Sequence, residues 1–342
     1  MATASDLRSC LAAAILAAAA TVAGTATAGP IFEPGTRVIV NANLRANPAC
    51  CGATVSDPTL AEAAVSPPPD PSALWYPPNN AVSRGRASLA EGSLKAEVLV
   101  PKHPTRNISG RAEAALNEVV TLALPSAGVA AGDMLTLRFL IDGTIVSPGS
   151  PNNIADFAIA AGFRLRDPTL FDPGNPDAPI PDVISYQKSI VQPFRFGRSE
   201  FTSFLQTVGS GEPVDDTTVE GLAEGRLFGF EATLPIDALL EAIGESRTLE
   251  FSAWLYLSAD VNSEAADGAA TTHLNFLDTA VIRATLPPGY AFLSESGFLS
   301  GSAATPEPTP DPVPMPTPVP EPASALLLLG GLAGLAAARR RR

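Results

Sequence analysis

The sequence is poor in the residues that most active sites and disulfide frameworks require. Its 342 residues include three cysteines and two histidines, and aromatic residues make up 6% of the chain. Cys10 precedes the first apolar run, and the other two cysteines, Cys50 and Cys51, are adjacent. Adjacent cysteines supply neither the separated partners of a disulfide framework nor the ligand spacing of a zinc site. A strained bridge between them, free thiols and intermolecular pairing all stay open.

Catalytic motifs are also lacking. His103 and His273 are the two imidazoles, and nothing around either one indicates a nucleophile with an oriented base. The sequence has no phosphate-binding loop, zinc-protease motif or dinucleotide fingerprint. Ser185 and Lys188 match the short pattern S-x-x-K, but its companion motifs are absent. We therefore predict no catalytic residues and no enzyme, with a secreted hydrolase using paired carboxylates as the least favoured alternative.

The charge balance is acidic, with 35 Asp and Glu residues, 22 Lys and Arg residues and a net charge of −13. This excess repels phosphate groups, so nucleic acid is not an expected partner. Asp260, Asn262 and Glu264 have the oxygen spacing of a calcium loop, but the following positions lack the glycine and glutamate of an EF-hand. We predict no metal site and no cofactor, with a generic calcium ion on an acidic loop as the alternative. Asp215-Asp216 is interpreted as another solvated acidic loop.

Most of the chain from Ile31 to about Ala304 is expected to form strands. Apolar and polar residues alternate over Met134–Ile141 and Leu249–Leu257, the period-2 pattern of half-buried antiparallel strands. Further strand candidates are Thr36–Asn41, Ser93–Val100, Asn117–Leu124, Ile154–Leu165, Val183–Phe196, Leu227–Glu231 and Phe276–Leu286. One short helix is predicted over Pro235–Ile243. The expected fold class is all-β, an antiparallel, jelly-roll-like β-sandwich built as one large sandwich or two small ones.

The stretch Asn47–Arg86 is rich in proline and small residues, and we predict a long loop or insertion packed over the sandwich. It contains Trp75 and Tyr76, an aromatic pair expected in a loop. The pair is interpreted as a cover for the edge of the core. Stacking on a sugar is the alternative, because both rings combine an apolar body with a polar tip.

Residues 1–28 have the pattern of a secretory signal peptide. Arg8 and the terminal amine precede the apolar run Leu11–Ala20, and Ala26 and Ala28 form an A-x-A cleavage site before Gly29. Signal peptidase is therefore an expected partner. An N-terminal membrane anchor that is retained is the alternative.

The tail has three features in order. Alternate prolines from Pro306 to Pro320 predict an extended polyproline II segment of roughly 45 Å, so residues 305–320 are interpreted as a stalk, with a linker of no role as the alternative. Residues 323–338 are apolar and predict a C-terminal transmembrane helix. At about 24 Å it is shorter than the ~30 Å hydrocarbon core of a membrane. A positively charged cytoplasmic stop follows, formed by Arg339, Arg340, Arg341 and Arg342.

Residues 319–342 resemble the PEP-CTERM sorting signal of bacterial proteins. The likeness is carried by Val319-Pro320-Glu321-Pro322-Ala323, then Leu326–Leu335, then Arg339–Arg342. The resemblance implies that an exosortase, an integral-membrane cysteine protease, recognises Pro320, Glu321 and Pro322 and processes the chain nearby. It also implies a precursor in the inner membrane, and then a protein at the cell surface or outside the cell, in bacteria that produce exopolysaccharide.

A second, looser likeness lies near the end of the ectodomain. His273–Ala280, Leu286–Phe292 and Ser296–Leu299 are similar to the closing strands of PEP-CTERM β-sandwich ectodomains. We therefore predict a non-enzymatic cell-surface or extracellular-matrix protein, with a sandwich ectodomain over residues 29–304 and exopolysaccharide as a candidate partner. A carbohydrate-binding surface module, with or without calcium, is the alternative.

Overall fold

The structure, a computed structural model, describes nine stretches of the chain. They are residues 34–44, 52–66, 81–101, 107–147, 155–168, 182–193, 198–220, 223–261 and 271–299. All nine belong to the first of the two units into which the chain divides, residues 1–304 and 305–342. The predicted signal peptide, stalk, sorting signal and transmembrane segment lie outside the described residues.

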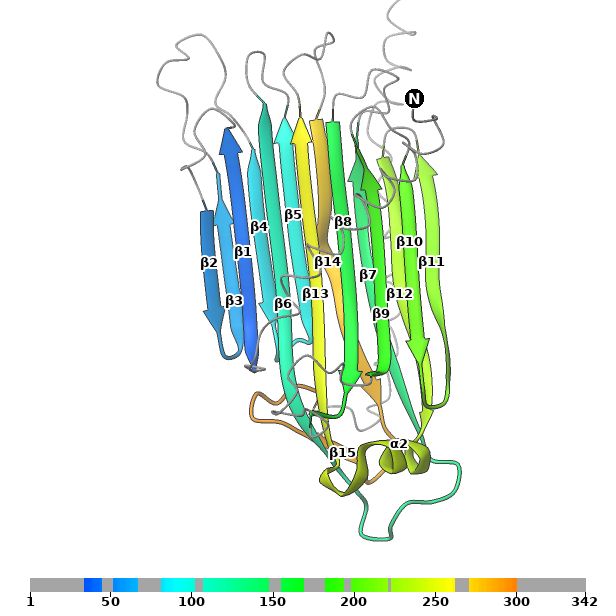
Figure 1. Cartoon of the computed structure of the whole chain (residues 1–342). Coiled ribbons are helices and arrows are strands. Elements are labelled where there is room, and N and C mark those ends of the chain that lie inside the picture. The colour runs from blue at the N-terminus through cyan, green and yellow to red at the C-terminus, as the bar shows by residue number, and fades with distance from the viewer. Residues whose placement is uncertain are drawn as a thin grey trace, which may run out of the picture. The chain divides into compact units, whose positions relative to one another are not determined.

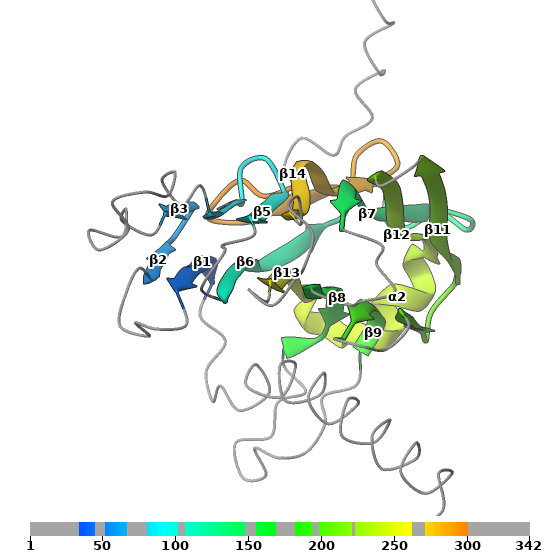
Figure 2. The same cartoon turned by 90° about the horizontal axis from the view of Figure 1, so that it is seen from above.

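The described strands form two antiparallel sheets that face each other (Figures 1 and 2). Sheet A has eight strands: β10 (Ser199–Gln206), β9 (Asp182–Gln192), β8 (Ala155–Arg166), β13 (Thr248–Val261), β6 (Ile108–Ala123), β1 (Gly35–Leu44) and β2 (Gly52–Asp57) in that order, with β15 (Ala291–Leu293) beside β6. Sheet B has seven: β11 (Ser210–Glu220), β12 (Ala223–Pro235), β7 (Met134–Val146), β14 (Thr271–Thr285), β5 (Ser93–Pro101), β4 (Val82–Ser88) and β3 (Leu60–Val65).

Neighbouring strands in each sheet come from distant parts of the chain. β13 lies between β6 and β8 in sheet A, and β14 lies between β5 and β7 in sheet B. The chain also passes from one sheet to the other at both edges, because β2 leads into β3 and β10 leads into β11. The described strands thus build one two-layer sandwich with the interleaved order of a jelly-roll-like fold. The predicted all-β sandwich is confirmed.

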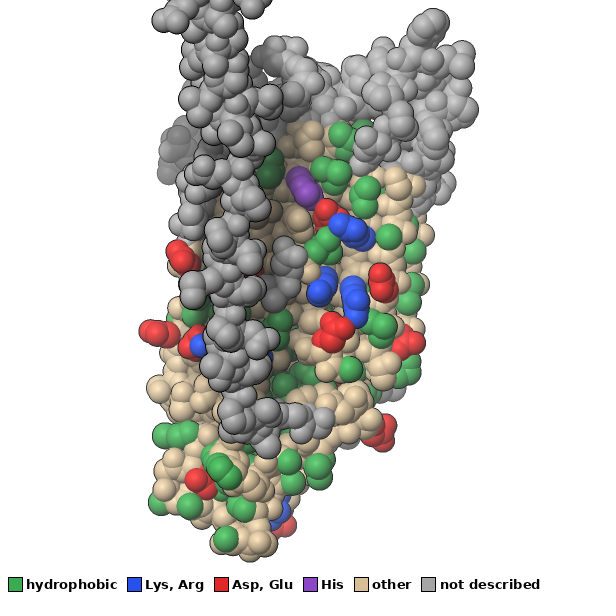
Figure 3. Space-filling model, turned by 180° about the vertical axis from the view of Figure 1, so that it is seen from behind, with side chains coloured by type: hydrophobic (Ala, Val, Ile, Leu, Met, Phe, Trp, Pro, Cys, Tyr) green, Lys and Arg blue, Asp and Glu red, His purple; other side chains and the backbone are tan. Residues whose placement is uncertain are grey.

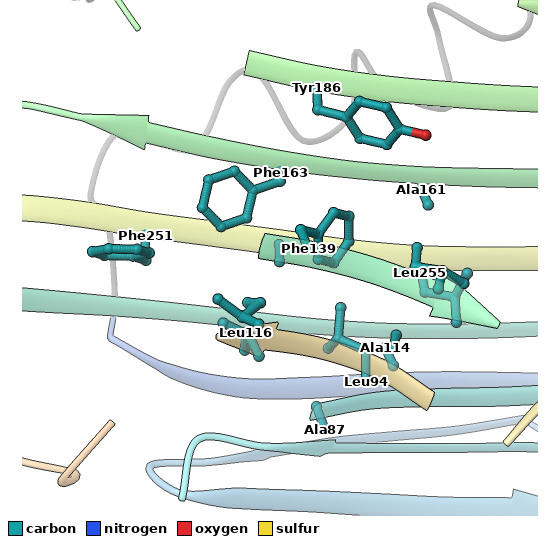
Figure 4. Packing of buried hydrophobic residues seen from close by; sticks show 14 of the residues in the cluster. Ala87, Leu94, Ala114, Leu116, Phe139, Ala161, Phe163, Tyr186, Phe251 and Leu255 are labelled. Carbon is teal, nitrogen blue, oxygen red and sulfur yellow. The ribbon is translucent and has the colours of Figure 1, made fainter. Parts of the chain in front are cut away.

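The core lies between the sheets because strand alternation directs apolar side chains inward. Phe139 of sheet B and Phe163 of sheet A have ring centroids 5.6 Å apart, so this contact joins the two layers (Figure 4). Phe230 lies 5.1 Å from Phe163, and Tyr186 lies 5.7 Å from Phe230. Each of these rings is almost fully buried. The aromatic cluster therefore fills the centre of the sandwich with large side chains from four different strands.

The helix α2 (Ile236–Ile243) confirms the one predicted helix and lies at an end of the sandwich (Figure 1). Pro235 precedes it, at a position where the first turn needs no N–H from this residue. Gly244 ends it with a φ of 65°, a left-handed value that favours glycine. Ile236, Leu239 and Ile243 are buried, so one side of the helix packs on the core.

The predicted long loop over Asn47–Arg86 is wrong, because β2, β3 and most of β4 lie in this stretch. The inward residues of β3 are Ala61 and Ala63, and alanine is not typical of strands, so the pattern gives little signal there. β2 and β3 are short edge strands on the same side of the two sheets. The pattern also does not predict β10 and β11, edge strands made largely of exposed polar residues.

The segment after β14 closes one end of the core. Phe292 and Phe298 pack against Phe251, with ring centroids 5.8 and 5.6 Å away. The Tyr290 hydroxyl donates a hydrogen bond to Asp133 Oδ2 at 2.5 Å, which ties the segment to the residue before β7. The sequence likeness at Leu286–Phe292 therefore corresponds to a turn and two aromatic anchors.

Replacing Phe163 by alanine is expected to lower the free energy of unfolding by about 3–5 kcal/mol, because it removes the ring that contacts both sheets. The matched control is Phe201→Ala, since Phe201 is an edge-strand aromatic with 53% of its surface exposed. The control is expected to change stability by about 0.5 kcal/mol or less. Urea unfolding of the purified variants measures both values, and similar losses would contradict the assignment of the core.

Candidate functional site

Two aromatic side chains, which we call the aromatic row, lie on the outer face of sheet A, on its middle strand β13. Trp254 and Tyr256 alternate with buried residues of this strand, so both rings lie on the outer face, where they are half-buried. The Arg164 guanidinium carbon lies 5.6 Å from the Trp254 ring centroid, and that of Arg111 lies 4.9 Å from the Tyr256 ring centroid. Cation–π contacts of this kind restrict the orientations of both rings.

Small residues on β8 make room for these rings. Trp254 is the register partner of Gly162, and Tyr256 is the partner of Ala160. A Cβ atom on Gly162 would overlap three atoms of the Trp254 ring. The indole therefore lies over the backbone of β8 instead of standing out from the sheet.

A polar hollow of about 340 Å³ continues the same face toward one end of the strands. It is lined by Asn41, Ser109, Gly110, Arg111, Asp156, Ser258, Ala259 and Asp260. Arg111 also contacts the Tyr256 ring, so the hollow and the aromatic row are continuous. Asp156 and Asp260 are register partners on β8 and β13, which places two carboxylates at the far end of the row. Asp260 is the described member of the predicted calcium loop, and Asn262 and Glu264 lie outside the described residues.

Ion pairs occupy the opposite end of this face. Arg166 Nε donates a hydrogen bond to Glu250 Oε1 at 2.7 Å, and both residues lie beyond Trp254 on neighbouring strands. Burial raises the pKa of Glu250, and the hydrogen bond and charge of Arg166 oppose that rise. Burial also raises the pKa of Asp182, against the charge of Arg164. The charge of Arg164, which lies over the Trp254 ring, thus acts on both carboxylates.

A second charged feature, the inter-sheet charge cluster, lies at the β10–β11 edge. Its members are Lys188, Arg198, Glu200, Asp215, Glu224 and Arg226. Lys188 and Arg226 are only 2% and 5% exposed, and they share the inward phase of Tyr186 and Phe228 on their strands. The three cations and three carboxylates balance in charge. Buried charges of this kind persist in a fold only when they are paired.

The contacts within the cluster cross from one sheet to the other. Lys188 of β9 pairs with Asp215 of β11, and its Nζ lies 3.2 Å from Glu200 Oε2. Arg226 Nη2 donates to Glu200 Oε1 at 2.5 Å. The interpretation of Asp215-Asp216 as a solvated loop is therefore wrong, because both residues lie in β11 and Asp215 binds a buried lysine.

The pKa values of Glu200, a member of the charge cluster, and of Tyr186, its neighbour, are both shifted. Burial opposes ionisation of Glu200, but the hydrogen bonds and charges of Arg226 and Lys188 outweigh it, so the pKa lies below its usual 4.5. Burial also raises the pKa of Tyr186, and the nearby charge of Asp215 raises it further. Glu200 is therefore stabilised in its ionised form, and Tyr186 in its neutral form.

The outer face of sheet B carries a smaller ion-pair group. His273 Nε2 lies 2.7 Å from Glu97 Oε1, and Arg84 pairs with the other oxygen of the same carboxylate. Figure 3 shows this histidine beside acidic and basic side chains. No hydroxyl group of the described residues is hydrogen-bonded to the ring. The pattern S-x-x-K is also separated in space, because Ser185 and Lys188 point to opposite faces of β9.

Several predicted residues lie outside the described part of the chain. They are Ala26, Ala28, Cys50, Cys51, Trp75, Tyr76, His103, Pro320, Glu321, Pro322 and Arg339–Arg342. The aromatic row on β13 was not identified from the sequence as a surface. One signal points to it, because Trp254 and Tyr256 share the phase of the polar residues Glu250 and Ser252.

Among the described residues, no three His, Cys, Asp or Glu side chains are grouped so that they could hold a metal ion. No helix among them has the length and apolar character needed to cross a membrane.

Comparison with known proteins identifies the tail. The C-terminal segment places the chain among proteins that carry a sorting signal. That signal is the PEP-CTERM protein-sorting motif, which matches residues 318–342 and includes the predicted residues Pro320, Glu321 and Pro322. The motif implies processing by exosortase-type machinery and export to the cell envelope or surface. No curated protein matches the chain.

The two kinds of shifted carboxylate predict opposite responses to acid. The lowered pKa of Glu200 gives stability that is present above pH 4.5 and is lost as the pH falls below it. The raised pKa of Glu250 gives stability that is present below pH 4.5 and is lost as the pH rises through the raised value. Glu200→Gln is therefore expected to lose less stability on acidification than the wild type, and Glu250→Gln to lose more. Urea midpoints from about pH 6 to about pH 3 measure this order, and the reverse order would contradict the assignments.

Lys188→Met is expected to lower the free energy of unfolding by about 2 kcal/mol or more, because Asp215 and Glu200 lose a buried cation. The matched control is Arg138→Met, which breaks the exposed pair that Arg138 forms with Glu231 at 2.6 Å. An exposed pair contributes about 1 kcal/mol or less. Thermal or urea unfolding of both variants measures the two losses in the free energy of unfolding. Equal losses would show that the inter-sheet cluster does not stabilise the fold.

Proposed function

We propose that this chain is a non-enzymatic protein of the cell surface or extracellular matrix. The observation that carries the proposal is the sorting motif at residues 318–342 in a chain whose described residues build an all-β sandwich. The predicted signal peptide and the predicted stalk agree with this reading, since one starts export and the other spaces the sandwich from the membrane. The sandwich is the part that acts outside the cell.

The described charged groups support a structural role for the ion pairs. His273, the described imidazole, is engaged with Glu97, and that carboxylate is shared with Arg84. Lys188 and Arg226 are held by carboxylates between the sheets. Catalysis by such groups needs a partner that can exchange protons with a substrate. Here these side chains are held in ion pairs with carboxylates, which favours a structural role over a catalytic one.

Processing at the sorting motif tests the proposal. Wild-type cells are expected to yield a mature protein that lacks residues 323–342 and is found outside the inner membrane. Replacing both Glu321 and Pro322 by alanine is expected to leave the full tail on protein in the inner membrane, because the processing enzyme loses its recognition site. Cell fractionation with mass mapping of the C-terminus measures both outcomes.

The control is the double variant Pro308→Ala and Pro310→Ala, which alters the proline ladder and keeps the motif. It is expected to be processed like the wild type. If residues 323–342 persist on wild-type protein in the inner membrane, the proposal is overturned and a simple tail anchor replaces it.

A further inference from the structure

We propose that β10 is an interaction edge at which two copies of this chain pair, strand to strand, around a twofold axis at Ser203. β10 lies at one end of sheet A, and β9 is its strand neighbour among the described strands. The other side of an edge strand presents backbone N–H and C=O groups that can pair with a further strand. Antiparallel pairing with a second β10 would join two A sheets into one continuous sheet.

The outer face of β10 carries two large apolar side chains that the sandwich leaves exposed. Phe201 and Leu205 have 53% and 54% of their surface exposed. Their register partners on β9 are Ser189 and Ser185, whose short polar side chains cannot cover a phenyl ring or a leucine. An edge strand with exposed apolar side chains is a site at which another strand can pair. These two residues therefore mark β10 as an interaction surface.

The pattern of β10 fits a second copy of itself. Phe201 and Leu205 lie at equal distances along the strand from Ser203. When two antiparallel copies cross at Ser203, Phe201 of each copy lies opposite Leu205 of the other, and the four side chains form one apolar group. On the inner face, Glu200 is the one charged residue of the strand, and it lies opposite Gln206 of the other copy. Self-pairing thus buries apolar surface without placing like charges opposite each other within the paired strands.

The inner face of β10 is already anchored within its own copy. Phe204 packs on Phe230, with ring centroids 5.5 Å apart. Glu200 forms ion pairs with Lys188 and Arg226, so its charge is compensated before any pairing. The strand is therefore held in shape while its outer face stays exposed. An edge that is ordered in advance loses less conformational entropy on association than a segment that folds on binding.

The other edge strands of the described part of the chain are less suited to self-pairing. β11 contains Pro213, which has no N–H to donate to another strand, and the carboxylates Asp215 and Asp216. β2 and β3 have six residues each, whereas β10 has eight. Short length, proline and charge are features that prevent pairing at sheet edges. The outer face of β10 has neither proline nor charge.

A charge exchange at the twofold axis tests the inference on the full-length chain purified in detergent. Energy transfer between two labelled populations measures the dissociation constant, and the wild type is expected to form dimers. Ser203→Lys and Ser203→Glu each place two like charges side by side at the axis, so each variant alone is expected to associate roughly tenfold or more weakly. An equal mixture of the two variants places opposite charges at the axis and is expected to restore the dimer.

Phe201→Ala is expected to weaken association by roughly tenfold, because it removes an aromatic ring from the apolar group. The same variant keeps the folding stability of a single copy, since the ring is exposed there. Unfolding of this variant is therefore compared with Phe163→Ala at concentrations too low for pairing. Unfolding midpoints also show that both Ser203 variants are folded.

The matched control places the same charges at the opposite edge of sheet A. Thr54 is an exposed residue of β2, and Thr54→Lys and Thr54→Glu are each expected to associate like the wild type. Preferential pairing of Ser203→Lys with Thr54→Glu, over Ser203→Glu, would overturn the inference in favour of a head-to-tail contact between β10 and β2.

Two further results would overturn the inference. One is wild-type protein that stays monomeric at every concentration reached. The other is association that does not respond to Ser203→Lys or Ser203→Glu, which would place the contact in the tail or on another surface. The assay uses purified protein and does not depend on sorting, so none of these results bears on the proposed function.

Discussion

The contact between Phe139 of sheet B and Phe163 of sheet A joins the two layers at the centre of the core (Figure 4). Once one set of alternating residues is committed to this core, the other set on every strand must face outward. On β13 the committed set includes Phe251 and Leu255, so Trp254 and Tyr256 are directed to the outer face. The outward position of this aromatic pair is thus a consequence of core packing. A one-residue shift in register would bury it.

The core changes character toward the β10–β11 edge. Aromatic rings give way to the inter-sheet charge cluster, in which Lys188 and Arg226 are nearly buried. Burying charges costs free energy that pairing only partly offsets. The cluster nevertheless links four strands of both sheets, including two edge strands that have one strand neighbour each. Its contribution is therefore to fix the position of β10 and β11, where apolar packing is thinner.

The fold could be predicted from the sequence where period-2 alternation is strong, as at β7 and β13. Proline and glycine also placed α2 correctly. The edge strands could not be predicted, because Ala61 and Ala63 lack the branched side chains that mark a strand. The aromatic site on β13 was harder to predict from the sequence than these strands. Its formation depends on Gly162 lying opposite Trp254, and strand pairing over such sequence distances leaves no local signal.

The sorting tail and the sandwich act at different stages after the chain is synthesised. The tail determines the route, because the PEP-CTERM motif implies processing by exosortase-type machinery. Under the proposed function, processing near Pro320–Pro322 separates the sandwich from its predicted membrane segment. On the same proposal, the processed protein has lost its tail, so its final location depends on contacts made by the sandwich.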